Sequence, residues 1–275
     1  MKLFRRVFNF YITSSIHVAL AIVALCLIAI KSLGLAIDFT LIAYIFLASV
    51  SGYNFIKYAE VAKWYHRSLP QEVRGIQIFS FLVFVALVYV AFKLPLPTLY
   101  ASGALAVITF FYAVPLLPTK NTLRGIKGLK IYVIALVWAL TAVLLPLANA
   151  GGQAHLDAIL LTAQLFLWVV ALTIPFELRD LQSDSPLLYT IPQLIGSKNA
   201  VRVGVLLYLL IWVLEGFKHE VSNGLLLCWM VVTVLGIWAL FKARRDQSLY
   251  FASFWVEGIP ILGAVVLFGW NQLFG

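Results

Sequence analysis

The chain has 275 residues, of which 63% are hydrophobic and only 11% are charged. The apolar residues gather in runs long enough to cross the hydrocarbon core of a bilayer, which indicates a polytopic membrane protein. The formal net charge of +9 requires no nucleic-acid partner, because basic joints that face an anionic lipid leaflet explain it.

Nine apolar runs follow one another with short polar joints between them, and a helix of about 20 residues spans roughly 30 Å. The first run follows three basic residues and has the outline of a signal peptide. It lacks a small-residue cleavage site and eight more runs follow, so we interpret it as a retained span. The sequence predicts an all-α, polytopic membrane bundle of nine transmembrane helices, in a single transmembrane domain over residues 1–275. The predicted spans lie near residues 14–32, 36–56, 77–94, 97–115, 131–149, 157–177, 200–216, 224–241 and 251–271.

The basic residues predict the orientation of these spans. With the N-terminus in the cytoplasm, all but three of the 20 basic residues fall in cytoplasmic segments. The exceptions are Lys31, Lys93 and Lys218. Because cytoplasmic loops are enriched in Lys and Arg, we expect an integral, multi-pass protein of the cytoplasmic or inner-membrane type, with its N-terminus inside and its C-terminus outside.

Three acids stand close together at the end of the sixth run, in the segment "PFELRDLQSD". Glu177, Asp180 and Asp184 are spaced i, i+3 and i+7, so they share one face if the helix continues past Pro175. One interpretation is that they offset Arg179 and the nearby basic loops at a solvated helix end. The other is an ion site, because Arg179 alone cannot pair three carboxylates.

This segment resembles the second Asp-rich motif of the UbiA superfamily of intramembrane prenyltransferases. The matching positions in "ELRDLQSD" and "TIPQLIG" are Glu177, Arg179, Asp180, Asp184, Thr190, Pro192 and Gly196. A second stretch, "FYAVPLLPTKNTLRG", resembles the family's Tyr-x-x-Pro and Lys/Arg loop after the fourth helix, through Tyr112, Pro115, Lys120 and Arg124. The resemblance covers nearly the whole chain and implies a nine-helix bundle that holds Mg²⁺ against a prenyl diphosphate.

The family's first Asp-rich motif, after the second helix, is degenerate in this chain. In "GYNFIKYAEVAKW" the motif's Asn is present as Asn54, but its three Asp positions hold Phe55, Tyr58 and Ala62. The ligands of one metal ion are therefore missing. Lys57, adjacent to Asn54 around the helix, can supply part of the positive charge, since a lysine acts as a point charge. It is also an ordinary residue for a cytoplasmic helix end.

Two interpretations of function remain open. In the first, the protein transfers a polyprenyl group from its diphosphate to an aromatic or other lipophilic acceptor, with Mg²⁺ in a reduced, single-ion site. The resemblance then implies these roles: Glu177, Asp180 and Asp184 bind the metal, Lys120, Arg124 and Arg179 bind the diphosphate, and Asn54, Tyr112 and Lys57 are catalytic. In the second, it is a non-catalytic relative that binds an isoprenoid, a quinone or a lipid, or serves as a scaffold, because a fold does not by itself confer an activity.

The two motif regions are expected to share one cavity. Asp180 and Asp184 should approach Asn54 across it, with Lys120 or Arg124 on its rim. Apolar side chains should line the deeper part, as a prenyl chain requires.

Overall fold

The structure, a computed structural model, describes residues 2–64, 71–113, 128–181, 188–219 and 221–274, with side chains except at residues 2, 58–64 and 71–73. Every regular element in these ranges is helical. In chain order they are α1 (Lys2–Thr13), α2 (Ile16–Ser32), α3 (Phe39–Trp64), α4 (Gln71–Ala91), α5 (Leu96–Ala113), α6 (Lys130–Asn149), α7 (Leu156–Asp180), α8 (Ile191–Ile195), α9 (Ser197–Glu215), α10 (Asn223–Lys242), the π-helical turn η3 (Phe251–Val256) and α11 (Ile259–Phe274).

The predicted membrane bundle is confirmed. In the described ranges, eight helical segments are long and apolar enough to cross a membrane, counting η3 and α11 as one, and the bent pair of α1 and α2 makes a ninth. The two helices of that pair meet at 54°, across a break at residues 14–15. The sequence prediction missed α1 as a separate helix and the short α8, because neither is a long apolar run.

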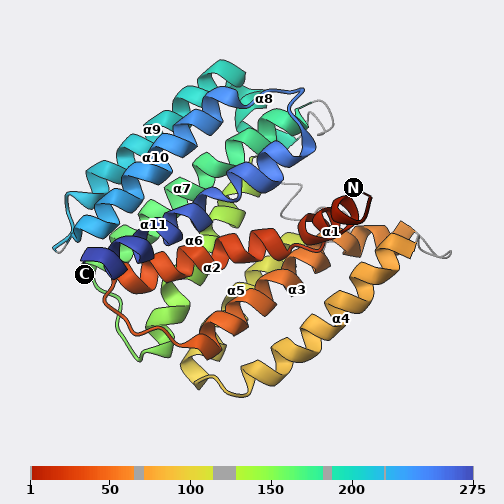
Figure 1. The fold of residues 1–275 in the computed structure, drawn as a ribbon, viewed down its shortest axis with the longest axis horizontal. Coiled ribbons are helices and arrows are strands. Elements are labelled where there is room, and N and C mark those ends of the chain that lie inside the picture. The colour runs from red at the N-terminus through yellow and green to blue at the C-terminus, as the bar shows by residue number, and fades with distance from the viewer. Residues whose placement is uncertain (1, 65–70, 114–127, 182–187, 220, 275) are drawn as a thin grey trace.

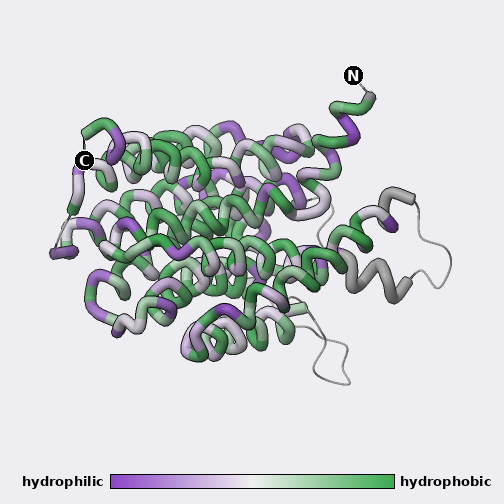
Figure 2. Tube along the Cα trace, turned by 60° about the horizontal axis from the view of Figure 1, so that its bottom comes forward, coloured by the Kyte–Doolittle hydropathy of each residue, from purple (hydrophilic) through white to green (hydrophobic). Residues whose placement is uncertain are grey.

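The helices form a closed arrangement in which α2 lies at the centre (Figure 1). Helix α2 contacts α3, α6 and α11, while α4 packs on the far side of α3. On the opposite flank α9 contacts both α7 and α10, and α10 also contacts α7 and α11. Helix α1 contacts α2, and its C-terminal residue Thr13 accepts a hydrogen bond from Lys57 of α3, while the N-terminus projects from this end of the bundle (Figure 2).

Large hydrophobic side chains cover the outside of the bundle as well as its interior. On α4, Phe81, Phe84 and Tyr89 are each more than half exposed, and the chain trace is apolar over most of the helical bundle (Figure 2). In the interior, the rings of Trp168 on α7 and Trp229 on α10 meet edge to face, 5.4 Å apart. An apolar outer face is what a bilayer requires, since lipid is the solvent there.

Helix α7 continues through Pro175 and ends only at Asp180. The proline removes one helical hydrogen-bond donor, which membrane helices tolerate where neighbouring groups satisfy the backbone. The carbonyl of Pro175 itself accepts a hydrogen bond of 2.9 Å from Nε2 of Gln247. The helix therefore carries Glu177 and Asp180 on one continuous element, as the sequence analysis required.

Candidate functional site

Two cavities meet inside the bundle, near the end at which α1 lies. The apolar cavity, of about 730 Å³, is enclosed by α2, α3, α4, α5, α6 and the end of α7. The polar cavity, of about 550 Å³, lies between α1, α3, the end of α7 and η3. Tyr53, Lys57 and Arg179 line both of them. These three residues therefore mark the boundary between the apolar cavity and the polar cavity.

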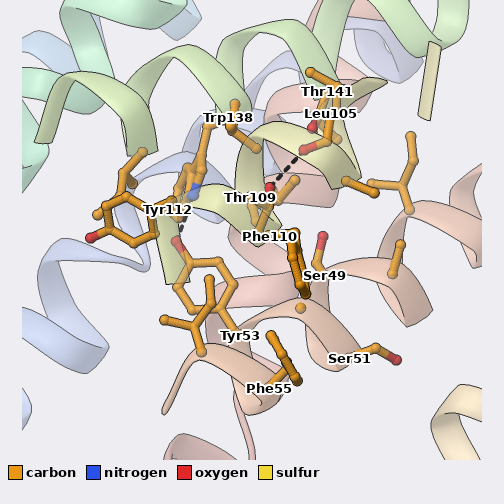
Figure 3. A pocket seen from close by; sticks show the side chains of 18 of the residues that line it. Ser49, Ser51, Tyr53, Phe55, Leu105, Thr109, Phe110, Tyr112, Trp138 and Thr141 are labelled. Carbon is orange, nitrogen blue, oxygen red and sulfur yellow. Dashed lines mark hydrogen bonds between the residues drawn. The ribbon is translucent and has the colours of Figure 1, made fainter. Parts of the chain in front are cut away.

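Several polar groups on the apolar cavity are hydrogen-bonded to one another or to the backbone, while Oγ of Ser51 is buried and bonds to none of the described residues. Tyr44 and Ser102 share a hydrogen bond of 2.6 Å, and Nε1 of Trp138 donates to the hydroxyl of Tyr53 at 2.6 Å. Thr109 donates to a backbone carbonyl of its own helix. Figure 3 shows the Tyr53–Trp138 pair, with Phe55 and Phe110 also lining the cavity. Such walls suit a hydrocarbon chain.

Three cationic side chains line this otherwise apolar cavity. Lys57 of α3 and Arg179 of α7 lie where the two cavities meet, and Lys130 is the first residue of α6. The Nζ of Lys57 donates to the carbonyl of Thr13 at 3.1 Å, at the C-terminal end of α1. Arg179 makes a bidentate pair with Asp180, with N···O distances of 2.7 and 3.0 Å. The three cations complement an anionic head group, and the apolar walls complement a hydrocarbon chain joined to it.

The two acids near the C-terminal end of α7, Glu177 and Asp180, have different surroundings. Asp180 lines the polar cavity and pairs with Arg179. Glu177 is buried, and its Oε2 accepts a hydrogen bond of 3.2 Å from the backbone N–H of Ile191, the first residue of α8. Glu177 thus anchors the N-terminus of α8, where unpaired N–H groups favour a carboxylate.

Asn54 lies on α3 but lines neither cavity. Its side chain is buried against α4, where Nδ2 donates to Oγ of Ser80 at 2.9 Å. Its Oδ1 is buried and receives a hydrogen bond from none of the described residues. The expectation that Asp180 would approach Asn54 across a shared cavity is therefore not met, because this face of α3 packs on α4.

The residues singled out from the sequence thus fall into three groups. Lys57, Tyr112 and Arg179 line the apolar cavity, and Lys57, Arg179 and Asp180 line the polar one. Asn54 and Glu177 line neither. Lys120, Arg124 and Asp184 lie outside the described residues. The cations at the boundary and one acid therefore come together, while the roles of Lys120, Arg124 and Asp184 stay predictions.

Sequence reasoning missed the contribution of the last span. Glu257, directly after η3, lines the polar cavity together with Tyr250, whose hydroxyl donates to Oδ1 of Asn9 on α1. One signal was available: Glu257 is the single charged residue in the predicted span 251–271. An ionisable residue inside a membrane segment is a functional candidate by default.

Comparisons with known proteins relate this architecture to a known fold. No protein-family model matches the sequence, and no curated protein matches it. Among solved structures, the apo form of a UbiA homologue from Aeropyrum pernix K1 superposes with a TM-score of 0.65 at 15% identity, covering 90% of this chain and 97% of the other. A UbiA homologue from Archaeoglobus fulgidus bound to GPP and Mg²⁺ gives 0.60 at 12% identity, with 93% and 98% covered. Digeranylgeranylglyceryl phosphate synthase gives 0.56 at 15% identity, with 95% and 98% covered.

These likenesses extend over nearly the whole length of both chains. At 12–15% identity they show the fold. The resemblance to the UbiA superfamily inferred from the sequence is therefore confirmed at the level of architecture. Activity has to be argued from the site itself.

Proposed function

We propose that this protein is an intramembrane prenyltransferase, which moves a polyprenyl group from its diphosphate to a lipophilic acceptor. The observation that carries the proposal is the grouping of Lys57, Lys130 and Arg179 on a cavity whose other walls are apolar. This combination complements a diphosphate head joined to a hydrocarbon tail. The UbiA homologue bound to GPP and Mg²⁺, which shares the fold, adds support.

The three cations would act where charge develops. When the bond between the first prenyl carbon and the diphosphate oxygen breaks, negative charge accumulates on the diphosphate, and fixed cations stabilise it. Arg179 offers a planar fork for phosphate oxygens, while Lys57 and Lys130 act as point charges. Tyr112, buried in the wall of the apolar cavity, would orient the substrate. Lys120 and Arg124 are proposed as further diphosphate ligands.

The residues present fit one Mg²⁺ better than two. In the described part of the chain, no three His, Cys, Asp or Glu side chains come together as a metal site. Mg²⁺ is commonly held by one or two carboxylates and by substrate phosphates, and Asp180 at the cavity surface can serve, with Asp184 as the proposed second ligand. Bound there, the ion would help to neutralise the leaving diphosphate. Glu177 would support this site by holding α8 in place.

The test is a titration of the purified protein with geranyl diphosphate and with geraniol, each with and without Mg²⁺. The diphosphate should bind more tightly than the alcohol, and Mg²⁺ should strengthen its binding. Lys57→Met, which keeps the stem and removes the charge, should weaken diphosphate binding about tenfold or more, since a charge-assisted contact contributes about 1.5–3 kcal/mol. Lys31→Met is the matched control, because this exposed lysine lies in the last turn of α2 and lines neither cavity.

The alternative function is a carrier or scaffold that binds neutral isoprenoids. Phe55 favours it, because this residue replaces the first Asp of the degenerate motif and lines the apolar cavity. A carrier should bind geraniol at least as tightly as geranyl diphosphate, with no effect of Mg²⁺ or of Lys57→Met. That result would refute the prenyltransferase proposal.

A further inference from the structure

Glu257 occupies an unusual position for a carboxylate. It is the single charged residue of the membrane segment Phe251–Phe274. It follows the π-helical turn η3, and its backbone N–H reaches five residues back to the carbonyl of Ala252, at 3.1 Å. Charged residues in membrane segments are costly, and π-helical turns are frequent at functional sites. Both features indicate that this carboxylate has a role.

Within the described part of the chain, Glu257 has cations near it but no hydrogen bond to its carboxylate. Its side chain lines the polar cavity, and Lys57 and Arg179 of the same cavity interact with it electrostatically. None of the described residues makes a hydrogen bond to its carboxylate. Arg179 is engaged by Asp180, and Lys57 by the carbonyl of Thr13. The ionised form of Glu257 is thus stabilised by two cations that also bind other groups, Asp180 and the carbonyl of Thr13.

A bound diphosphate changes this balance. Lys57 and Arg179 line both cavities, so a head group seated on them lies in the compartment that Glu257 faces. Even with one Mg²⁺ bound, the diphosphate keeps a net negative charge, which competes with Glu257 for the same two cations and repels the carboxylate. A like charge nearby disfavours the ionised form of an acid, and burial away from water strengthens the effect.

We propose that Glu257 is a further catalytic residue, which takes up a proton as the prenyl diphosphate binds and donates it to the leaving diphosphate. This inference rests on the proposed prenyl transfer. Glu257 would thereby supply part of the charge neutralisation that the missing first motif no longer provides.

The proton balance closes over one cycle. The bond between the first prenyl carbon and the diphosphate oxygen breaks, its electron pair stays on that oxygen, and the proton of Glu257 transfers to the diphosphate. The acceptor then forms its bond to the prenyl carbon and loses a proton, which the Glu257 carboxylate takes. Diphosphate leaves with one added proton, and as the site empties Glu257 releases the proton that it took up on binding and returns to its ionised state.

Several other titratable or charged groups face Glu257 from the elements packed around it, and any proton uptake must be separated from theirs. They are Tyr11 of α1, Tyr53 and Lys57 of α3, Arg179 and Asp180 of α7, and Tyr250 before η3; His17 of α2, bonded to Tyr11 and to the carbonyl of Phe254, lies next to Gly258. A variant that removes only the Glu257 proton therefore has to serve as the reference.

The experiment is calorimetric titration of the intact protein with geranyl diphosphate at neutral pH, in two buffers of different ionisation enthalpy, with Mg²⁺ present throughout. The difference in observed heat between the buffers gives the number of protons taken up. Glu257→Gln mimics the protonated acid in size and neutrality, and it corrects for protons exchanged by the ligand and by the other groups. The wild-type protein should take up about one proton more per bound ligand than this variant.

Glu257→Gln should bind geranyl diphosphate at least as tightly as the wild type, because it lacks the repelling charge. Its rate of prenyl transfer should fall about 10²–10⁴-fold, the usual contribution of general acid–base catalysis. Asp246→Asn, an exposed acid outside both cavities, is the matched control and should keep the wild-type proton uptake.

Equal proton uptake by the wild type and Glu257→Gln would overturn this inference while leaving the prenyltransferase proposal intact. Full transfer activity in Glu257→Gln would overturn it as well. A wild-type protein that binds no geranyl diphosphate would refute the proposed function, and this inference with it.

Discussion

The buried ion pair at the far end of α9 offers a direct test of how this bundle is stabilised. Oε2 of Glu215 accepts hydrogen bonds from Nζ of Lys218 and from Nε2 of Gln164, both at 2.7 Å. The side chains of Lys218 and Glu215 are only 2% and 3% exposed. The Lys218 ammonium also lies 5.9 Å from the centroid of the Trp229 ring. Removal of the acid would leave a buried cation without its counter-ion.

We expect Glu215→Leu to destabilise the protein by about 3–5 kcal/mol, the usual cost of breaking a buried pair by removing one partner. For a chain of this size that corresponds to a fall of roughly 6–20 °C in the midpoint of thermal unfolding. Exposed ion pairs contribute far less, so a loss of this size depends on the burial of both groups.

The loss should depend on pH. Burial lowers the pKa of Lys218, while the hydrogen bond and charge of Glu215 raise it. Between its folded pKa and its ordinary value of 10.5, the unfolded chain binds more protons, so stability rises with pH in that window. In Glu215→Leu the raising influence of Glu215 is lost and only the charge of Asp157 still raises the pKa of Lys218, so the window extends to lower pH. The variant should therefore regain stability as the pH rises, over a wider range than the wild type.

Unfolding can be followed with a thiol-reactive fluorophore, because Cys26 and Cys228 are both fully buried in the folded protein. The matched control is Glu215→Leu combined with Lys218→Met, which removes both charges and should recover most of the lost stability. Gln164 keeps its bond to the carbonyl of Ile211 in either variant. A single variant as stable as the wild type, or a double variant less stable than the single one, would refute the reasoning.

Two further predictions concern packing and pH. Gly236→Ala on α10 should lower the free energy of unfolding by about 1–3 kcal/mol, because its new Cβ would overlap the Tyr208 ring. Gly103→Ala on α5, whose new Cβ would meet no neighbouring atom within 4 Å, should be neutral or stabilise by up to about 1 kcal/mol. The midpoints of thermal unfolding of the two variants test this difference. A hydrogen bond from Asn149 holds the pKa of Asp38 below its usual value, so the stability it contributes is present above that value and is lost as the pH falls through the folded pKa. Asp38→Asn should remove this part of the fall in the thermal midpoint at acid pH. An unchanged fall of the midpoint at acid pH would contradict a stabilising role for the Asp38 carboxylate.

Local rules in the sequence were sufficient to predict the membrane architecture. A backbone in lipid must satisfy its own hydrogen bonds, so each long apolar run becomes a helix whose length matches the bilayer. That is why the runs near 157–177 and 251–271 reappear as α7 and as η3 with α11. The resemblance also implied that the two motif regions share one cavity. Lys57 and Arg179, one from each region, line the same two cavities, although Asn54 lines neither.

Only the tertiary structure decided which side of each helix faces that site. In a membrane, helices are apolar on all sides, so the sequence carries no amphipathic stripe that separates the inner face from the lipid face. Asn54 and Lys57 are three residues apart on α3, yet one packs on α4 while the other reaches the cavities. Glu257 of the last span lines the polar cavity together with Lys57, because η3 packs beside α7 and the cavity is also lined by α1. This proximity is set by packing between elements that are distant in sequence.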